Sequence, residues 1–430
     1  MPGWTRGRRA WIAAMLIAAV CAGLAPAEAA PAPESAPLAT KTPPAAFVRE
    51  GDLWIKADGH ERAVTSGEYV RHPKWSRDGK WIAFTRGKQE EELWVMNVAT
   101  GESRLISDHS GPADFRWSPT GSRLAYLSQA QLYLCDMQPE ARPLLVAADI
   151  SNFAWLPDGA GFLASSAAHL LAGTWTPVRI GKIRLPSGGK PGSIETFYVL
   201  PAMGSDFFAV GTSTFKWSAD GRWIAFVAKP TASLSVDADY LCVLSADGRT
   251  FKTIGRMLAY EEWFSWAPQG ANLAYIGGIG RETTQDKKLT VASVPNGKPA
   301  VYTPTGYVDQ SLAWRGERRI AVSRAPESTW SANPAARPLP YLAEANLDSG
   351  SQAKLTSPGA DQGDYGPISL PGQRLAWVRS DRATGQADVL ISGANPAQAA
   401  VWIRHLDQGT DYYEHLDWSP VLGILGQPAP

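Results

Sequence analysis

A ten-residue phrase recurs along the chain, and its repetition constrains the fold more than any other feature. It reads Trp-Ser-Arg-Asp-Gly-Lys-Trp-Ile-Ala-Phe at residues 75–84 and Trp-Ser-Ala-Asp-Gly-Arg-Trp-Ile-Ala-Phe at residues 217–226. Looser copies begin at Trp117, Trp155, Trp266 and Trp314, a further copy carries Ile368 in the Trp position, and a truncated copy begins at Trp418. Repeats at a spacing of about 40–50 residues are typical of β-propeller blades.

Each repeat has the pattern of a four-stranded blade. An apolar residue stands two positions before most of the Trp residues, as Phe115 does before Trp117, which places both side chains on one face of a strand. Asp-Gly or Pro-x-Gly then supplies a tight turn, and Ile/Leu-Ala-aromatic begins a second strand. A third and a fourth apolar run follow in each copy. The repeats therefore predict an all-β chain.

The number of blades depends on how the two ends of the repeat region combine. The segment 46–65 resembles a repeat without its first strand, and the copy at Trp418 is a first strand with little after it. If the N-terminal strands pair with the C-terminal strand, one composite blade closes the ring and leaves no open sheet edge. We therefore predict a single propeller of eight blades, with seven as the alternative if Trp418 lies in an irregular segment.

These repeats resemble the TolB-like, WD-like propeller units of bacterial envelope and secreted proteins, over roughly residues 46–420. They also resemble the propeller domains of prolyl-oligopeptidase-type peptidases. The resemblance implies a propeller fold. TolB carries a separate α/β domain and the peptidases carry a hydrolase domain, and we expect this chain to be a propeller without either.

The N-terminal residues have the composition of an export signal. Arg6, Arg8 and Arg9 precede an apolar run, and Ala27-Glu28-Ala29 suits signal peptidase. We predict a signal peptide at residues 1–29, a Pro/Ala-rich linker at 30–45 and the propeller at 46–430. The mature chain is then expected in the periplasm or outside the cell, without a transmembrane segment, as a monomer. The sequence leaves open whether Cys21 is lipidated.

Composition and motifs exclude several classes of function. Without residues 1–29 the chain has 38 basic and 40 acidic residues, which gives no basis for binding nucleic acid. Cys135 and Cys242 are expected to be separate buried thiols. The sequence contains no Gly-x-Ser-x-Gly, and the six His residues are scattered, so we predict no catalytic residue, no metal site and no cofactor.

The loops that follow second and fourth strands carry the candidate binding residues. In a propeller these loops open on one face, and here they are long and rich in acids and aromatics. Their radial repetition would form a ring of carboxylates and aromatic rings that suits a basic peptide, a cation or a sugar; alternatively, the acids only solvate the loops and the tyrosines finish the blade rims. The candidates are Tyr69, Asp114, Glu261, Glu262, Trp263, Tyr307, Asp309, Asp364, Tyr365, Tyr413 and Glu414.

Two functions follow from this face. The first is an exported, non-catalytic binding propeller that recognises a protein, a peptide or an envelope polymer. The alternative is a carbohydrate-active enzyme, a lyase or a glycosidase, with two carboxylates from different blades in the channel mouth. A third interpretation, a structural partner in a larger complex, would require a broad exposed apolar patch.

Overall fold

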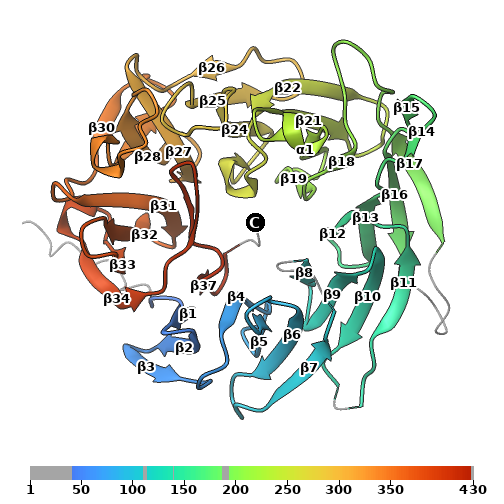
Figure 1. The fold of residues 1–430 in the computed structure, drawn as a ribbon, viewed down its shortest axis with the longest axis horizontal. Coiled ribbons are helices and arrows are strands. Elements are labelled where there is room, and N and C mark those ends of the chain that lie inside the picture. Colours follow the sequence, from blue (N-terminus) through green and yellow to red (C-terminus); the bar gives the residue numbers. More distant parts are fainter. Residues whose placement is uncertain (1–40, 110–113, 139, 186–192, 428–430) are drawn as a thin grey trace, which may run out of the picture. The chain divides into compact units, whose positions relative to one another are not determined.

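The chain from Thr42 onward forms one compact unit in a computed structural model, which describes residues 41–109, 114–138, 140–185 and 193–427. The predicted signal peptide and most of the predicted linker lie outside the described residues. Within the described residues, eight antiparallel sheets follow one another around a central axis (Figure 1). The fold is therefore a β-propeller of eight blades, as the sequence predicts, and the alternative of seven is wrong.

Seven blades are each formed by one continuous stretch of chain, and their strands run from the axis outward. The first three are β4 (Val70–Trp75), β5 (Trp81–Arg86), β6 (Glu92–Asn97) and β7 (Ser103–Ser107); β8 (Phe115–Trp117), β9 (Arg123–Ser128), β10 (Gln131–Asp136) and β11 (Leu144–Ala148); and β12 (Asn152–Trp155), β13 (Gly161–Ser165), β16 (Arg179–Arg184) and β17 (Ile194–Val199).

The other four continuous blades complete the series. They are β18 (Gly211–Thr212) with β19 (Lys216–Trp217), β20 (Trp223–Lys229), β21 (Asp239–Ser245) and β22 (Phe251–Met257); β23 (Phe264–Trp266), β24 (Asn272–Gly277), β25 (Lys288–Ser293) and β26 (Ala300–Val301); β27 (Tyr307–Trp314), β28 (Arg319–Pro326), β29 (Tyr341–Asn346) and β30 (Gln352–Lys354); and β31 (Gln362–Leu370), β32 (Arg374–Asp381), β33 (Ala387–Ile391) and β34 (Ala400–Leu406).

Short elements decorate the loops between strands. Two small hairpins are formed by β14 (Leu170–Leu171) with β15 (Thr174–Trp175) and by β35 (Thr410–Tyr412) with β36 (His415–Asp417). The helical elements are α1 (Ala232–Ser235), η1 (Glu261–Trp263), η2 (Pro334–Ala336) and η3 (Pro396–Gln398). Among the described residues, no helix has the length and apolar character needed to cross a membrane.

The eighth blade joins the two ends of the described chain. Its strands are β37 (Leu422–Ile424), β1 (Ala45–Arg49), β2 (Asp52–Ala57) and β3 (His60–Ala63), with β37 innermost. This confirms the predicted closure. The sequence predicts that the segment at Trp418 forms the closing strand, and this placement is wrong. The hairpin β35–β36 and a turn occupy residues 410–421, and β37, which follows them, pairs with β1.

The repeated phrase encodes one hairpin and one contact between blades. In the turn after β4, Ser76 Oγ donates to Asp78 Oδ1 (2.7 Å) and accepts from Trp81 N (3.0 Å), and Gly79 has φ +70°. The indole N–H of Trp117 donates to the carbonyl oxygen of Lys74 in the preceding blade (2.8 Å). Equivalent bonds are donated by Trp75, Trp155, Trp266 and Trp314.

In three repeats, the basic residue directly before the repeat Trp makes a cation–π contact with the next blade in the ring. The ammonium of Lys74 lies 4.4 Å from the ring centre of Phe115 in the next blade, and that of Lys216 lies 4.3 Å from Phe264. Arg116 lies over Phe153 at 5.0 Å. These cation–π contacts join the innermost strands, so the same side chains line the axis and stabilise the ring.

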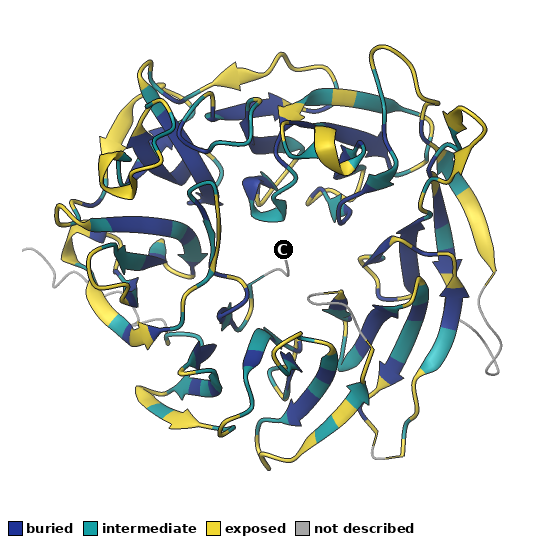
Figure 2. Ribbon diagram, viewed as in Figure 1, coloured by how far each residue is buried: buried dark blue, intermediate teal, exposed yellow. Residues whose placement is uncertain are grey.

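Burial follows the order of strands within a blade. Buried residues concentrate in the inner and middle strands, and exposed residues in the outermost ones (Figure 2). Cys135 and Cys242 are free and buried in separate blades, as the sequence predicts. The core is thus a set of layers between sheets, and the polar residues with access to the axis belong to the innermost strands and the loops.

Candidate functional site

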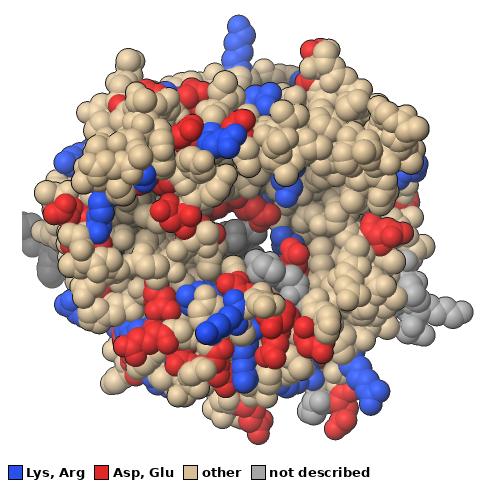
Figure 3. Space-filling model, in the orientation of Figure 1, with Lys and Arg blue, Asp and Glu red and all other residues tan. Residues whose placement is uncertain are grey.

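A short helical turn presents two adjacent carboxylates to the central opening of the ring. In η1, which precedes the innermost strand β23, Trp263 is fully buried and anchors the turn. The side chains of Glu261 and Glu262 are 30% and 35% exposed. In the space-filling view, acidic and basic side chains gather at the edge of the central opening (Figure 3). We call this opening the channel mouth.

Glu261 is held by residues of two earlier blades, Arg116 in β8 and the segment from Thr214 to Lys216 at β19. Its Oε1 accepts from the backbone N–H (3.0 Å) and the hydroxyl (2.6 Å) of Thr214, and Arg116 Nη2 lies 3.9 Å away. Lys216 Nζ donates to the main-chain oxygen of Glu261. Burial opposes ionisation, but the charges of Arg116 and Lys216 and the bonds from Thr214 leave the pKa of Glu261 below its ordinary value.

Glu262 is paired with a histidine that lies 153 positions later in the chain. His415 Nε2 and Glu262 Oε1 are 2.5 Å apart. The imidazole is stacked on the ring of Tyr260, with 3.5 Å between centroids, and meets Trp263 edge-on at 5.5 Å. Burial would raise the pKa of Glu262, yet the charge and hydrogen bond of His415 lower it overall. Glu262 is therefore an ionised carboxylate beside a fixed imidazole.

Three ionisable groups near Glu261 and Glu262 have pKa shifts that favour their neutral forms. Burial and the nearby charge of Glu262 raise the pKa of Asp417, despite hydrogen bonds from the backbone N–H (2.8 Å) and the hydroxyl (3.0 Å) of Ser419. Burial also raises the pKa of Asp114, and burial together with the charge of Arg116 lowers the pKa of Lys74 to about 8. Adjacent groups with opposed pKa shifts are typical of sites that transfer protons.

These residues form one electrostatically coupled group, which we call the wall cluster. Its members come from the innermost strands β4, β8 and β19, from the residue just before β8, from η1 and from β36. They are Lys74, Asp114, Arg116, Lys216, Glu261, Glu262, His415 and Asp417. Among the described residues, no group of three or more His, Cys, Asp or Glu side chains is arranged to hold a metal ion.

The hairpin β35–β36 carries His415 to the wall cluster. Its two turn residues, Tyr413 and Glu414, have φ of 50° and 67°, a conformation that costs energy for residues other than glycine. The turn is fixed from outside: Thr283 Oγ1 donates to the Tyr413 carbonyl (3.0 Å), and Arg337 Nη1 lies 2.6 Å from Glu414 Oε1. The β24–β25 and β28–β29 loops thus hold the hairpin at the channel mouth.

The residues selected from the sequence fall into three groups. Asp114, Glu261 and Glu262 belong to the wall cluster, Trp263 anchors it, and Tyr413 and Glu414 form the turn of the hairpin. Tyr69 lies apart, at the seam between the composite blade and β4. The remaining four lie elsewhere in β27 and β31: Tyr307, Asp309, Asp364 and Tyr365.

Three of those four are buried. Asp309 and Asp364 are 0% exposed and are paired with Arg324 and Arg379, respectively. Tyr365 is 4% exposed and packs in the core near Trp418. Their side chains are therefore enclosed by the blades, and in this conformation a ligand at the channel mouth does not reach them.

Sequence reasoning missed five members of the wall cluster. Lys74, Arg116 and Lys216 each stand directly before the Trp of a repeat, so the repeat alignment itself carries a signal for them. Asp417 stands in the same position before Trp418, the start of the truncated copy. His415 carries no comparable signal, because the hairpin that places it interrupts the repeat pattern.

No protein-family model matches the chain. Its curated relatives include dipeptidyl-peptidase 5 of Porphyromonas gingivalis, 27% identical over 130 residues (28% of this chain, 19% of that protein). They also include the uncharacterized peptidase YuxL of Bacillus subtilis, 29% identical over 117 residues (24% of this chain, 18% of that protein). The aligned segment thus spans less than a fifth of either relative.

A puromycin-hydrolyzing peptidase of Mycobacterium tuberculosis is a similar solved structure. Its TM-score is 0.50 at 16% identity, over 79% of this chain and 54% of that one. At this identity the likeness concerns the fold alone, and it agrees with a β-propeller.

These matches overturn the function expected from the sequence. Both curated relatives are peptidases, so the expectation of a non-catalytic binding propeller is contradicted. The lyase or glycosidase alternative has weaker support. An oligogalacturonate lyase of Vibrio parahaemolyticus covers 82% of this chain and 96% of its own, but with a TM-score of 0.48 and 14% identity. The long loops alone are consistent with recognition and with catalysis, and no sequence motif distinguishes the two.

Proposed function

We propose that the protein acts in peptide hydrolysis and that the wall cluster is its substrate site. The observation that carries this proposal is the pair Glu261 and Glu262, whose carboxylates are about one-third exposed at the channel mouth. The free amino end of a peptide is a cation, and carboxylates that are already ionised bind it without a change in protonation. The similarity to peptidases agrees with this class of substrate.

The opposed pKa shifts of Glu262 and Asp417 provide a base and an acid for hydrolysis. In this proposal the Glu262 carboxylate accepts a proton from a water molecule, whose oxygen forms a bond to the amide carbon. The C–N bond then breaks, and Asp417, which keeps its proton to a higher pH than an ordinary aspartate, gives that proton to the departing nitrogen. His415 positions Glu262 through their hydrogen bond.

We also propose that the protein is exported and that its propeller is of the TolB-like type. The N-terminal basic and apolar residues support export, and the repeats support a propeller of the TolB-like type. An exported peptidase would meet peptides in the periplasm or outside the cell.

The test is hydrolysis of short fluorogenic peptides by the full chain, with free and with acetylated amino ends. We expect cleavage that requires the free amine, declines as pH rises through the raised pKa of Asp417, and falls at least tenfold in kcat/KM in Glu262→Gln and in Asp417→Asn. Glu195→Gln, an exposed carboxylate on β17, is the matched control.

Two outcomes would count against parts of the proposal. Binding of free-amine peptides that depends on Glu262, without cleavage, would overturn the catalytic roles and leave the substrate site in place. Cleavage that is unchanged in both variants would overturn the wall cluster as the site.

A further inference from the structure

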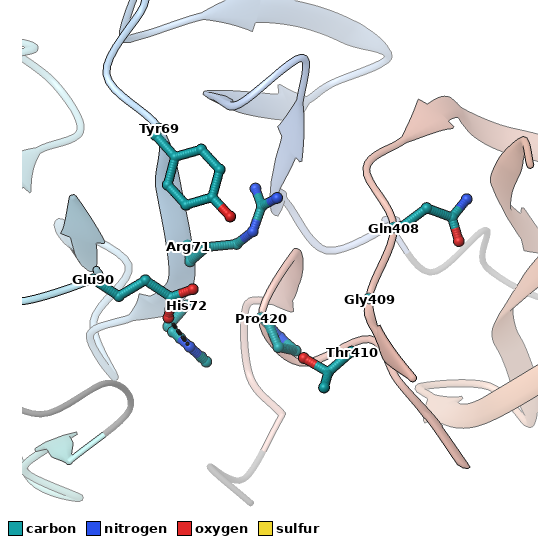
Figure 4. A pocket seen from close by; sticks show the side chains of 8 residues that line it. All are labelled: Tyr69, Arg71, His72, Glu90, Gln408, Gly409, Thr410 and Pro420. Carbon is teal, nitrogen blue, oxygen red and sulfur yellow. Dashed lines mark hydrogen bonds and ion pairs between the residues drawn. The ribbon is translucent and has the colours of Figure 1, made fainter. Parts of the chain in front are cut away.

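A polar pocket lies at the seam where the ring closes. It has a volume of ≈ 440 Å³ and lies between β4 of the first continuous blade and residues 408–410, which lead into β35 (Figure 4). Its lining includes Tyr69, Arg71, His72, Glu90, Thr410 and Pro420. A space of this size suits a small ligand, and both charged and hydroxyl-bearing side chains converge on it. We call it the seam pocket.

Arg71 is fixed in this pocket along one side of its guanidinium group. Nη1 donates to the carbonyl of Val70 (3.0 Å) and to Asp407 Oδ2 (3.2 Å), and the guanidinium carbon lies 4.5 Å from the ring centre of Tyr69. Asp407 is itself held by the backbone N–H groups of Glu50 (2.7 Å) and Gly51 (2.9 Å). The Arg71 side chain is only 14% exposed, so it is a positioned group and not a free surface arginine.

The other edge of Arg71 has no acceptor among the described residues. That edge consists of Nε and Nη2, whose two N–H bonds point the same way and match the two oxygens of a carboxylate. Among the described residues, this edge binds both oxygens of a buried carboxylate in two ion pairs: Nε and Nη2 of Arg324 bind Asp309, and those of Arg379 bind Asp364. In the seam pocket no carboxylate of the described chain fills the corresponding place.

Glu90 provides the opposite charge in the same pocket. Its Oε2 lies 2.9 Å from His72 Nε2, a hydrogen bond that lowers the pKa of Glu90 and keeps the carboxylate ionised. No described residue donates to its Oε1. Tyr69 and Thr410 add hydroxyl groups that likewise have no partner among the described side chains. A multiply charged anion would be repelled by Glu90, whereas a ligand that carries both an amine and a carboxylate satisfies both charges.

We propose that the seam pocket binds a small zwitterion, an amino acid or a dipeptide, with its carboxylate on Nε and Nη2 of Arg71 and its ammonium on Glu90. The choice of an amino acid or a dipeptide rests on the proposed function, because hydrolysis of peptides releases this class of molecule. The charged groups of the seam pocket, Arg71 and Glu90, are not members of the wall cluster, although Thr410 of the pocket pairs with Asp417 across β35 and β36. Since β4 and residues 408–410 belong to opposite sides of the seam, a bound ligand would also hold the ring closed.

The test is calorimetric titration of the full chain with L-alanyl-L-alanine, in a Glu262→Gln background so that the wall cluster does not consume or hold the ligand. We expect one binding event, with affinity reduced about tenfold or more for the acetylated and for the amidated dipeptide. Arg71→Gln should abolish the preference for a free carboxylate, and Glu90→Gln should abolish the preference for a free amine. Arg77→Gln, an exposed residue of the neighbouring turn, should change neither.

The two variants Arg71→Gln and Glu90→Gln test the site independently, so the result of one suffices if the other is unstable. Glu90→Gln leaves the Arg71–Asp407 pair intact, so loss of amine discrimination in this variant alone supports the site even if Arg71→Gln unfolds. No binding at millimolar concentration, or binding with unchanged discrimination in Glu90→Gln, would overturn the proposal. Binding is measured in protein that carries Glu262→Gln, and hydrolysis is measured separately. A negative binding result therefore does not count against the hydrolytic role of the wall cluster, and absence of hydrolysis does not count against binding in the seam pocket.

Discussion

Asp309 and Arg324 lie opposite each other on β27 and β28 and form a two-point ion pair from which water is excluded. Arg324 Nε is 2.6 Å from Asp309 Oδ1, Nη2 is 2.7 Å from Oδ2, and the side chains are 3% and 0% exposed. One blade further, Asp364 and Arg379 repeat the arrangement on β31 and β32. These aspartates therefore join the first two strands of a blade.

Replacement of Asp309 by Ala is expected to destabilise the fold strongly. The change would leave the Arg324 guanidinium buried without its carboxylate, and breaking a buried ion pair in this way costs about 3–5 kcal/mol. Urea unfolding monitored by tryptophan fluorescence measures the loss. Asp361→Ala removes an exposed carboxylate just before β31 and should cost under about 0.5 kcal/mol. Equal stability of the two variants would contradict the structural role of the pair.

The sequence was sufficient for the fold because each blade repeats its own local signals. Trp-Ser-Arg-Asp-Gly at residues 75–79 encodes a strand end, a turn and a contact between blades within five residues, and the structure confirms the turn and the contact. The placement of Trp418 was wrong because the hairpin β35–β36 is an insertion with no counterpart in the other repeats.

The candidate site was predictable only in part. Glu261 and Glu262 precede a repeat, so radial repetition placed them at the channel mouth. Asp309 and Asp364 also precede a repeat but are buried. Each is paired with an arginine directly opposite on the adjacent strand, Arg324 and Arg379, respectively. Each of these arginines follows the first apolar residue of its second strand by four positions, a signal that alignment of the repeats could reveal. His415 reaches Glu262 only through the folded hairpin.

Replacement of Trp266 by Phe should weaken the contact between two blades. The Trp266 indole N–H donates to the carbonyl of Lys216 (2.8 Å), and its loss leaves that carbonyl without this donor, at a cost of about 1–2 kcal/mol. Trp217 occupies the same repeat position, but its buried Nε1 has no acceptor among the described residues. Trp217→Phe should therefore be close to neutral. Chemical denaturation of both variants measures the difference, and a larger loss in Trp217→Phe would refute the role of the hydrogen bond.

Two equivalent glycines allow a comparison of backbone strain with steric contact. Gly79 and Gly221 have φ of +70° and +69°, so Ala at either position should cost about 1 kcal/mol. A Cβ at Gly79 would lie 3.0 Å from Leu425 Cδ2, whereas a Cβ at Gly221 would have no atom within 4 Å. We expect Gly79→Ala to lower the melting temperature more than Gly221→Ala does. The opposite order in a calorimetric scan would mean that Leu425 does not pack against this turn.

Asp239, the first residue of β21, is expected to make stability fall as pH rises from about 4 to about 7. Burial raises the pKa of Asp239 from 3.8 to about 7, despite the hydrogen bond from Ser235 (2.6 Å), and its Oδ2 is buried without a partner among the described residues. Between these pH values the folded state holds a proton that the unfolded state has lost, so protonation favours folding at the acid end. The effect is up to about 4 kcal/mol.

Asp239→Asn should remove this contribution, because the amide does not ionise. Its free energy of unfolding relative to the unsubstituted protein should therefore increase steadily from pH 4 to pH 7.5, as measured by urea unfolding at several pH values. Asp237→Asn, which alters an exposed partner of Arg281, is the control and should show no such trend. A difference between Asp239→Asn and the unsubstituted protein that is constant across this range would mean that the Asp239 carboxyl titrates in the folded protein as it does in the unfolded chain.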